Sequence, residues 1–99
     1  MNISKACNIV RSILDDPTGK CYMASEALYH LLGGKEAGLT PMVIRHHGLT
    51  HWYLRDRDGN YIDLTADQFD DSVDYKSGRG CGFLTKQPSK RTKELMGWQ

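Results

Sequence analysis

The sequence predicts an α+β domain in which N-terminal helices pack on a small antiparallel β-sheet and a C-terminal helix completes the fold. In the first third of the chain, apolar residues recur at helical spacing, and in the middle third they alternate with polar residues, as in half-buried strands. Because the helical and strand patterns are segregated along the chain, we expect an antiparallel sheet. With 99 residues, we expect a single domain over 1–99 with one modest core.

Two amphipathic helices are predicted before the first strand. An apolar stripe runs through residues 3–14, and the sequence DDP at 15–17 stops that helix. The second helix is predicted to begin near Cys21, after the turn at 18–20, and to end at the glycine pair 33–34. Cys7 lies on the first apolar stripe, so we expect it to pack in the core.

Strands and one more helix are predicted in the rest of the chain. The segment PMVIRHH at 41–47 is predicted to be a strand entered by a proline, and THWYLRDRDGNYIDLTADQF at 50–69 is predicted to be a β-hairpin whose last five residues form a helical turn or a bend. The acidic segment 70–74 is expected to be an exposed connection. A short strand is expected around 81–84, and Pro88-Ser89 cap a last helix.

The loop of the hairpin determines which side chains share a face. A two-residue loop would place Asp63 opposite Leu54 and leave His51 on the other face from Asp63. A three-residue loop, Arg57-Asp58-Gly59, instead separates an apolar face from a polar one. The apolar face then carries Trp52, Leu54, Ile62 and Leu64, and the other face carries His51, Tyr53, Tyr61 and Asp63. We therefore predict the three-residue loop, with His51 and Asp63 as diagonal neighbours roughly 7–8 Å apart.

One cysteine has the context of a nucleophile. The three cysteines are Cys7, Cys21 and Cys81, and this odd number without a secretory signal indicates free thiols in a reducing compartment. Only Cys21 is predicted at a helix N-terminus, which favours the thiolate. A thiol nucleophile needs a base, and the base needs a group that orients it. His51 and Asp63 supply these two roles.

The segments GKCYMASEALYHLLGG, PMVIRHHG, HWYL and DGNYIDLT together resemble a compressed transglutaminase-like domain of the papain-like superfamily. The resemblance spans residues 19–69 and implies a nucleophile at Cys21, a general base and acid at His51, and an orienting group at Asp63. The hairpin segment also resembles small proteins of tailed bacteriophages. The chain departs from the family in its short length and in having no glutamine or tryptophan just before Cys21. Without such a side chain, the backbone N–H of Cys21 is the one donor that we can name for the oxyanion.

By this resemblance the chain is a cysteine-dependent hydrolase or acyltransferase acting on an amide, isopeptide or thioester. Protease, deamidase and transglutaminase activities remain open, since they share the triad. The alternative is a non-catalytic binding or inhibitor module of phage type on a degenerate papain-like fold. A peptide or protein substrate is expected, or a host protein as partner if the chain is phage-encoded.

Several further residues are weighed for a role in the site. Asp67 is a second candidate orienting group, and Gln68 is a candidate substrate contact. Tyr53 is a candidate cleft wall, with a packed aromatic as the equal alternative. We expect Glu26 and His30 to form a surface or helix-packing pair.

No metal and no cofactor are expected. His46 and His47 together with His51 and Cys81 lack zinc-ligand spacing. The glycines of SGRGCG at 77–82 lack the strand-helix context of a phosphate loop, so they are interpreted as allowing a tight bend.

Composition excludes several protein classes. Hydrophobic residues at 39% and charged residues at 25% are typical of globular domains, so disorder is not expected. A net charge of +1 gives no support for nucleic-acid binding. Binding through the basic C-terminal helix is a third and weaker functional hypothesis, after the enzyme and the binding module. No apolar run is long enough for a membrane span, and no signal-peptide core is recognisable. We therefore expect a cytoplasmic protein, in the host cytoplasm if phage-encoded.

Overall fold

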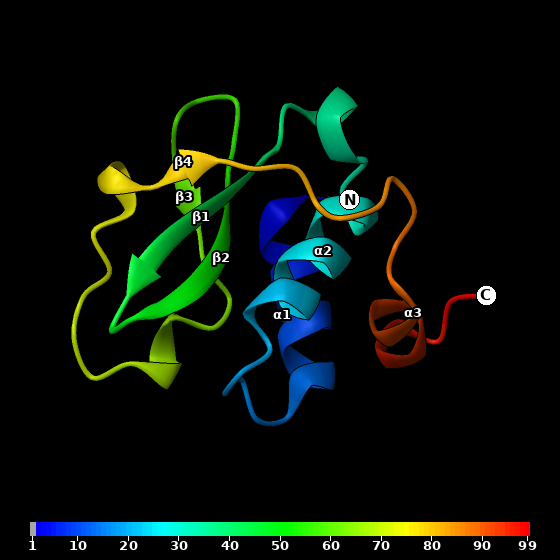
Figure 1. Ribbon diagram of the computed structural model, residues 1–99. Helices are drawn as coiled ribbons and strands as arrows, with labels where there is room; N and C mark the ends of the chain where they lie inside the picture. Colours follow the sequence, from blue (N-terminus) through cyan, green and yellow to red (C-terminus); the bar gives the residue numbers. More distant parts are fainter. Residues whose placement is uncertain (1) are drawn as a thin grey trace.

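The computed structural model describes residues 2–99 and has an α+β fold, with two N-terminal helices, a four-stranded antiparallel sheet and a C-terminal helix (Figure 1). The elements in chain order are α1 Ile3–Leu14, α2 Cys21–Leu31, η1 Gly34–Ala37, β1 Thr40–His46, β2 Leu49–Arg55, β3 Tyr61–Ile62, η2 Ala66–Gln68, η3 Tyr75–Ser77, β4 Arg79–Gly80 and α3 Lys90–Met96. The strand order is β3-β2-β1-β4. Figure 1 shows α1 and α2 between the sheet and α3. No helix within residues 2–99 is long and apolar enough to cross a membrane.

The helices bury most of the apolar stripes that the sequence predicts, whereas Ile3 and Ile13 of α1 stay exposed. The fully buried core consists of Ala6, Val10 and Leu14 from α1, Ala24, Ala27 and Leu28 from α2, and Leu39 and Leu54. Cys7 is half-buried and packs against this core, as expected from its place on the stripe. Asn2 caps α1 by accepting a hydrogen bond from the Lys5 N–H at 2.7 Å.

The β2–β3 hairpin has the predicted three-residue loop. Leu54 pairs with Ile62, the Asp56 N–H donates to the Asn60 carbonyl at 2.9 Å, and Gly59 takes the left-handed conformation with φ 85°. In this register Leu54 belongs to the core, whereas His51 lies on the opposite face of β2. The separation of faces inferred from the apolar pattern is confirmed.

Two strand predictions need correction. β3 ends at Ile62, so Asp63 lies just beyond the strand and not inside it. The Thr65 N–H donates to Asp63 Oδ1 at 3.1 Å, and this local side-chain bond replaces the ladder with a turn. The strand expected around 81–84 is instead β4, at Arg79–Gly80.

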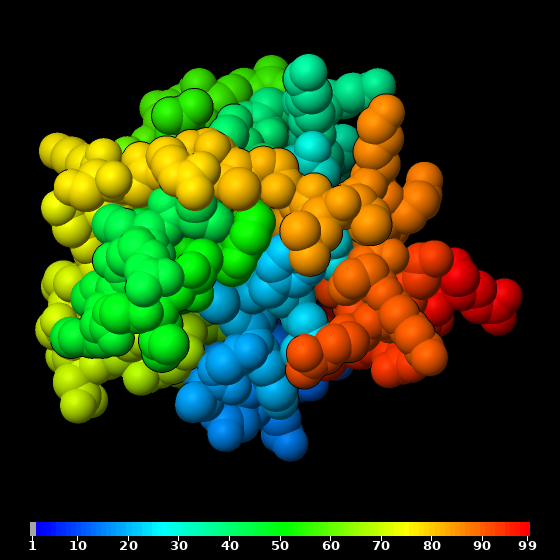
Figure 2. Space-filling view, viewed as in Figure 1, coloured from blue at the N-terminus to red at the C-terminus, as the bar shows by residue number. Residues whose placement is uncertain are grey.

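The chain after β4 leaves the sheet because it binds α2 instead. The Leu84 N–H donates to the Tyr22 hydroxyl at 2.9 Å, and the Phe83 ring packs edge-on against Tyr22 with centroids 5.3 Å apart. Figure 2 shows this segment, coloured yellow to orange, running from the sheet towards α2. The β1 strand also differs by one residue at each end from the predicted 41–47.

The C-terminal helix docks through a buried carboxylate. Glu26 of α2 is fully buried, and its Oε1 accepts a hydrogen bond from the Ser89 N–H at 2.9 Å. Ser89 is the predicted N-cap and its hydroxyl accepts from the Thr92 N–H. Glu26 therefore packs α2 against the start of α3, and within residues 2–99 no hydrogen bond joins it to His30, its predicted partner.

Candidate active site

Cys21 is the first residue of α2, an eleven-residue helix that points its N-terminus at β2. The turn before it and the strand beside it leave the side chain half-buried, with Sγ 3.9 Å from the Thr50 carbonyl oxygen. Lys20 precedes the helix without a side-chain cap. The sulfur therefore lies at the positive end of the helix dipole, where negative charge is favoured.

His51 lies on β2, opposite Ile44 of β1, and its side chain is 1% exposed. Its Nε2 lies 2.6 Å from Asp63 Oδ2, and its ring packs edge-on against Phe69 with centroids 5.0 Å apart. Nδ1 is buried and has no hydrogen-bond partner among residues 2–99. One ring nitrogen is thus committed to Asp63, and the other is available for a proton transfer.

The Asp63 carboxylate accepts hydrogen bonds from His51, Thr65 and Tyr75. Oδ2 accepts from His51 Nε2 and from the Tyr75 hydroxyl at 2.8 Å. Oδ1 accepts from the Thr65 N–H at 3.1 Å and lies 3.4 Å from the Thr65 hydroxyl. With its side chain 4% exposed, the carboxylate is fixed in position and shielded from water. This is the arrangement that orients an imidazole.

The two reactive groups shift each other's pKa in opposite directions. Burial raises the pKa of the Cys21 thiol, but His51 and the backbone N–H groups of Trp52 and Tyr22 outweigh it, so the pKa is lowered. Burial lowers the pKa of His51, but Asp63 and Cys21 outweigh this effect and raise it to about 9. Both directions favour a thiolate beside an imidazolium.

The thiol and the imidazole are close without forming a hydrogen bond of ordinary geometry. The Cys21 thiol is directed at the Thr50 carbonyl, while His51 Nδ1 has no partner in the described chain. Pairs of this kind are often long or poorly aligned before a substrate binds.

Tyr75 and Thr65 support the site and were not anticipated from the sequence. Thr65 stands two residues after Asp63, the spacing of a side-chain-capped turn, and this local signal was available. Tyr75 lies twelve residues away on η3, and nothing local indicates that its hydroxyl reaches Asp63. Burial, reinforced by Asp63, raises the pKa of Tyr75, so its hydroxyl stays a hydrogen-bond donor.

Gln68 and Asp67 are placed away from direct contact with His51. The Gln68 side chain accepts from the Gly19 N–H at 3.2 Å and donates to the Thr65 hydroxyl at 2.9 Å. It therefore links the loop before Cys21 to the turn that holds Asp63. Asp67 forms an ion pair with Arg11 of α1, so Asp63 and not Asp67 orients His51.

Tyr53 is packed under the site and does not form a cleft wall. Its side chain is fully buried, its ring stacks beside His51, and its hydroxyl donates to the Tyr75 carbonyl at 2.7 Å. Gly78 makes this possible, because a Cβ there would lie 1.8 Å from the Tyr53 hydroxyl oxygen. Gly78 and Tyr53 thus hold the backbone that presents Tyr75 to Asp63.

A hollow of about 270 Å³ begins at the residues that flank Cys21. It is lined by Gly19, Tyr22, Met23, Leu84, Ser89 and Arg91. A larger hollow of about 520 Å³ runs along Tyr29, Leu39 and Phe83, and none of Cys21, His51 and Asp63 lines it. None of these three residues lines the smaller hollow either, but Tyr22, which does line it, follows Cys21 directly in the chain.

Comparisons with known proteins give no assignment. No protein-family model matches this chain, and neither the curated proteins nor the solved structures contain a match.

Proposed function

We propose that this protein is a cysteine-dependent hydrolase or acyltransferase that acts on an amide, isopeptide or thioester. The observation that carries the proposal is the buried His51, held by Asp63 on one ring nitrogen while the other is free beside Cys21. Buried polar side-chain atoms usually have a hydrogen-bond partner, whereas a general base must keep one ring nitrogen available.

The chemistry follows from these three side chains. The Cys21 thiolate attacks the carbonyl carbon, and the C–S bond forms as the carbonyl π electrons move to oxygen. His51 then gives its Nδ1 proton to the leaving amine or thiol, whose bond to the carbonyl carbon breaks and leaves a thioester on Cys21. In the second half, His51 takes a proton from water or an acceptor amine that attacks the thioester, and the thiolate is released.

Asp63 keeps the ring in one orientation throughout these steps and stabilises the imidazolium. The backbone N–H of Cys21 is at the N-terminus of α2, where helical N–H groups have no partner within the helix, so it is a donor for the oxyanion. The smaller hollow is lined by Tyr22, the residue after Cys21, and by Met23, Leu84 and Arg91. This lining suits a side chain of a peptide or protein substrate.

The order of the site along the chain also supports a finer description of the fold. A cysteine at a helix start, a histidine on a strand and an aspartate after the next strand form the order of a papain-like, transglutaminase-like domain. We propose that the chain is a compressed member of that group.

Acyl-enzyme formation tests the function directly. Peptidyl thioesters with varied side chains are mixed with the protein, and intact mass spectrometry measures the added acyl mass. We expect acylation at Cys21 that turns over in water or with an added amine. Asp63→Asn should slow it, Cys21→Ala should abolish it, and Cys81→Ser, a matched half-buried thiol, should leave it unchanged.

Absence of any acyl adduct across such a panel, with a folded protein, would contradict the proposal. So would equal acylation of Cys81. The binding-module alternative predicts that Cys21→Ala keeps the full biological effect of the wild-type chain.

A further inference from the structure

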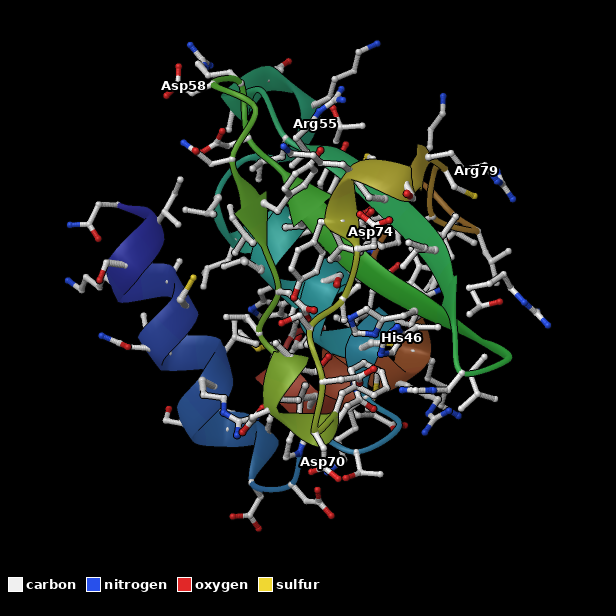
Figure 3. All side chains as sticks on the ribbon, turned by 90° about the vertical axis from the view of Figure 1, so that its left-hand side faces the viewer. His46, Arg55, Asp58, Asp70, Asp74 and Arg79 are labelled. Carbon is white, nitrogen blue, oxygen red and sulfur yellow. The ribbon has the colours of Figure 1, made fainter. Side chains whose placement is uncertain are left out.

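A second cluster of ligand-type side chains lies at the β1–β2 turn, outside the site described above. His46 ends β1, His47 begins the turn, and Asp71 comes from the chain after η2. Asp71 Oδ1 lies 3.2 Å from His46 Nε2 and 3.0 Å from His47 Nε2. Figure 3 labels His46 and Asp70, the residue that precedes Asp71 in the chain.

The backbone of the turn creates this cluster. Neighbouring residues of a strand point to opposite faces, so two consecutive histidines would normally diverge. His47 instead has φ 54° and Gly48 has φ 77°, a left-handed pair that forms a tight hairpin turn. The two imidazole rings consequently lie on the same side with centroids 4.2 Å apart.

Two of the three separations between the ligand atoms match those of a zinc site. Tetrahedral zinc with bonds of about 2.0 Å separates its ligand atoms by about 3.3 Å. Both His–Asp separations are within a few tenths of an ångström of that value, and all three atoms lie within 4.8 Å of one another. The His46 side chain is 12% exposed, whereas those of His47 and Asp71 are about half exposed, so the ion would have an open side towards solvent.

We propose that His46, His47 and Asp71 bind one Zn²⁺ ion with a water molecule as the fourth ligand. Two imidazoles and one carboxylate are a ligand set that zinc accepts readily. The sequence grouped the two histidines with His51 and Cys81 and predicted no metal. The fold replaces those partners with Asp71, because His51 is bound to Asp63.

The ion would tie the β1–β2 turn to the chain that follows η2. Phe69 lies between this cluster and the candidate active site, packing on His46 with centroids 4.5 Å apart and on His51 with centroids 5.0 Å apart. Zinc binding would therefore fix the aromatic ring that backs His51. This zinc site does not depend on the proposed function, since none of its ligands belongs to the triad.

Zinc titration by calorimetry on the Cys21→Ser chain tests the proposal, because this variant removes the thiolate as a competing ligand. We expect one Zn²⁺ per chain. His47→Asn, which tolerates the left-handed turn, and Asp71→Asn should each weaken binding by at least tenfold. Asp70→Asn is the matched control and should leave the affinity unchanged.

Imidazole nitrogen resonances give a second readout on the same samples. Zinc should shift the ring nitrogens of His46 and His47 and leave those of His30 in place. The proposal is overturned if zinc does not bind, if His47→Asn and Asp71→Asn bind as well as Cys21→Ser alone, or if the ring nitrogens of the two histidines do not move.

Discussion

Replacing Asp63 by asparagine should remove the interaction that raises the pKa of His51. The substitution is made in the Cys21→Ser chain, so that the thiolate does not contribute. Burial alone lowers the pKa of His51, and it is the carboxylate of Asp63, hydrogen-bonded at 2.6 Å, that raises it in this background. In Cys21→Ser we therefore expect a pKa above the ordinary 6.5, and in the double variant a pKa at or below 6.5.

The raised pKa of His51 also makes the free energy of unfolding depend on pH. The interval between the ordinary 6.5 and about 9 corresponds to about 3 kcal/mol at 1.36 kcal/mol per pH unit, and Asp63 supplies at most that amount. Because the folded pKa is raised, this stability is fully present below pH 6.5 and is lost as the pH rises through the folded pKa, which in Cys21→Ser lies below about 9 because the thiolate no longer contributes. The free energy of unfolding of Cys21→Ser should fall over this window, and the double variant should lose that decline.

The assay is an NMR titration of the His51 ring protons in both variants, with urea unfolding at several pH values alongside. His30, whose pKa is lowered by burial, is the internal control, and its pKa should be the same in both variants. An unchanged His51 pKa after Asp63→Asn would refute the interpretation that Asp63 holds the imidazolium.

Two other substitutions test how the site and the last helix are supported. Gly78→Ala would force a Cβ into the Tyr53 hydroxyl, so it should lower the free energy of unfolding by about 1–3 kcal/mol in urea. The control is Gly82→Ala, whose Cβ meets nothing within 4 Å and should change the free energy of unfolding by no more than about 0.5 kcal/mol. Equal effects would contradict the close packing around Tyr53. Glu26→Ala leaves the N-terminus of α3 without its buried acceptor and should cost about 1–3 kcal/mol, with the exposed Glu94→Ala as control. A neutral Glu26→Ala would show that α3 docks without this bond.

The parts of the structure that depend on local pattern could be predicted from the sequence. The hairpin register followed from the alternation around Leu54 and Ile62, because a slip of one residue would have exposed the apolar set. The place of Cys21 at the start of α2 followed from the turn before it and the stripe after it. The register alone placed His51 beside Asp63, and the grouping of Cys21 with them came from the family resemblance.

The remaining features depend on contacts between distant segments. Tyr75 reaches Asp63 only because the chain after η2 folds back across the sheet, and no periodicity encodes that path. The residues after β4 have a strand-like composition, but the Tyr22 hydroxyl takes the Leu84 N–H and draws them to α2. Asp71 meets the two histidines of the β1–β2 turn for the same non-local reason.

The pH dependence of alkylation tests the central claim that His51 activates Cys21. Iodoacetamide rates are measured at each cysteine by peptide mass spectrometry in the wild-type chain and in His51→Ala. We expect Cys21 to react fastest near neutral pH, with an inflection below the ordinary thiol pKa of 9.0, because its pKa is lowered. Cys7 should react slowly, since burial raises its pKa. His51→Ala should move the Cys21 inflection upward and slow its reaction near neutral pH. Equal rates at Cys21 and Cys81, or a Cys21 profile unchanged by His51→Ala, would contradict the account.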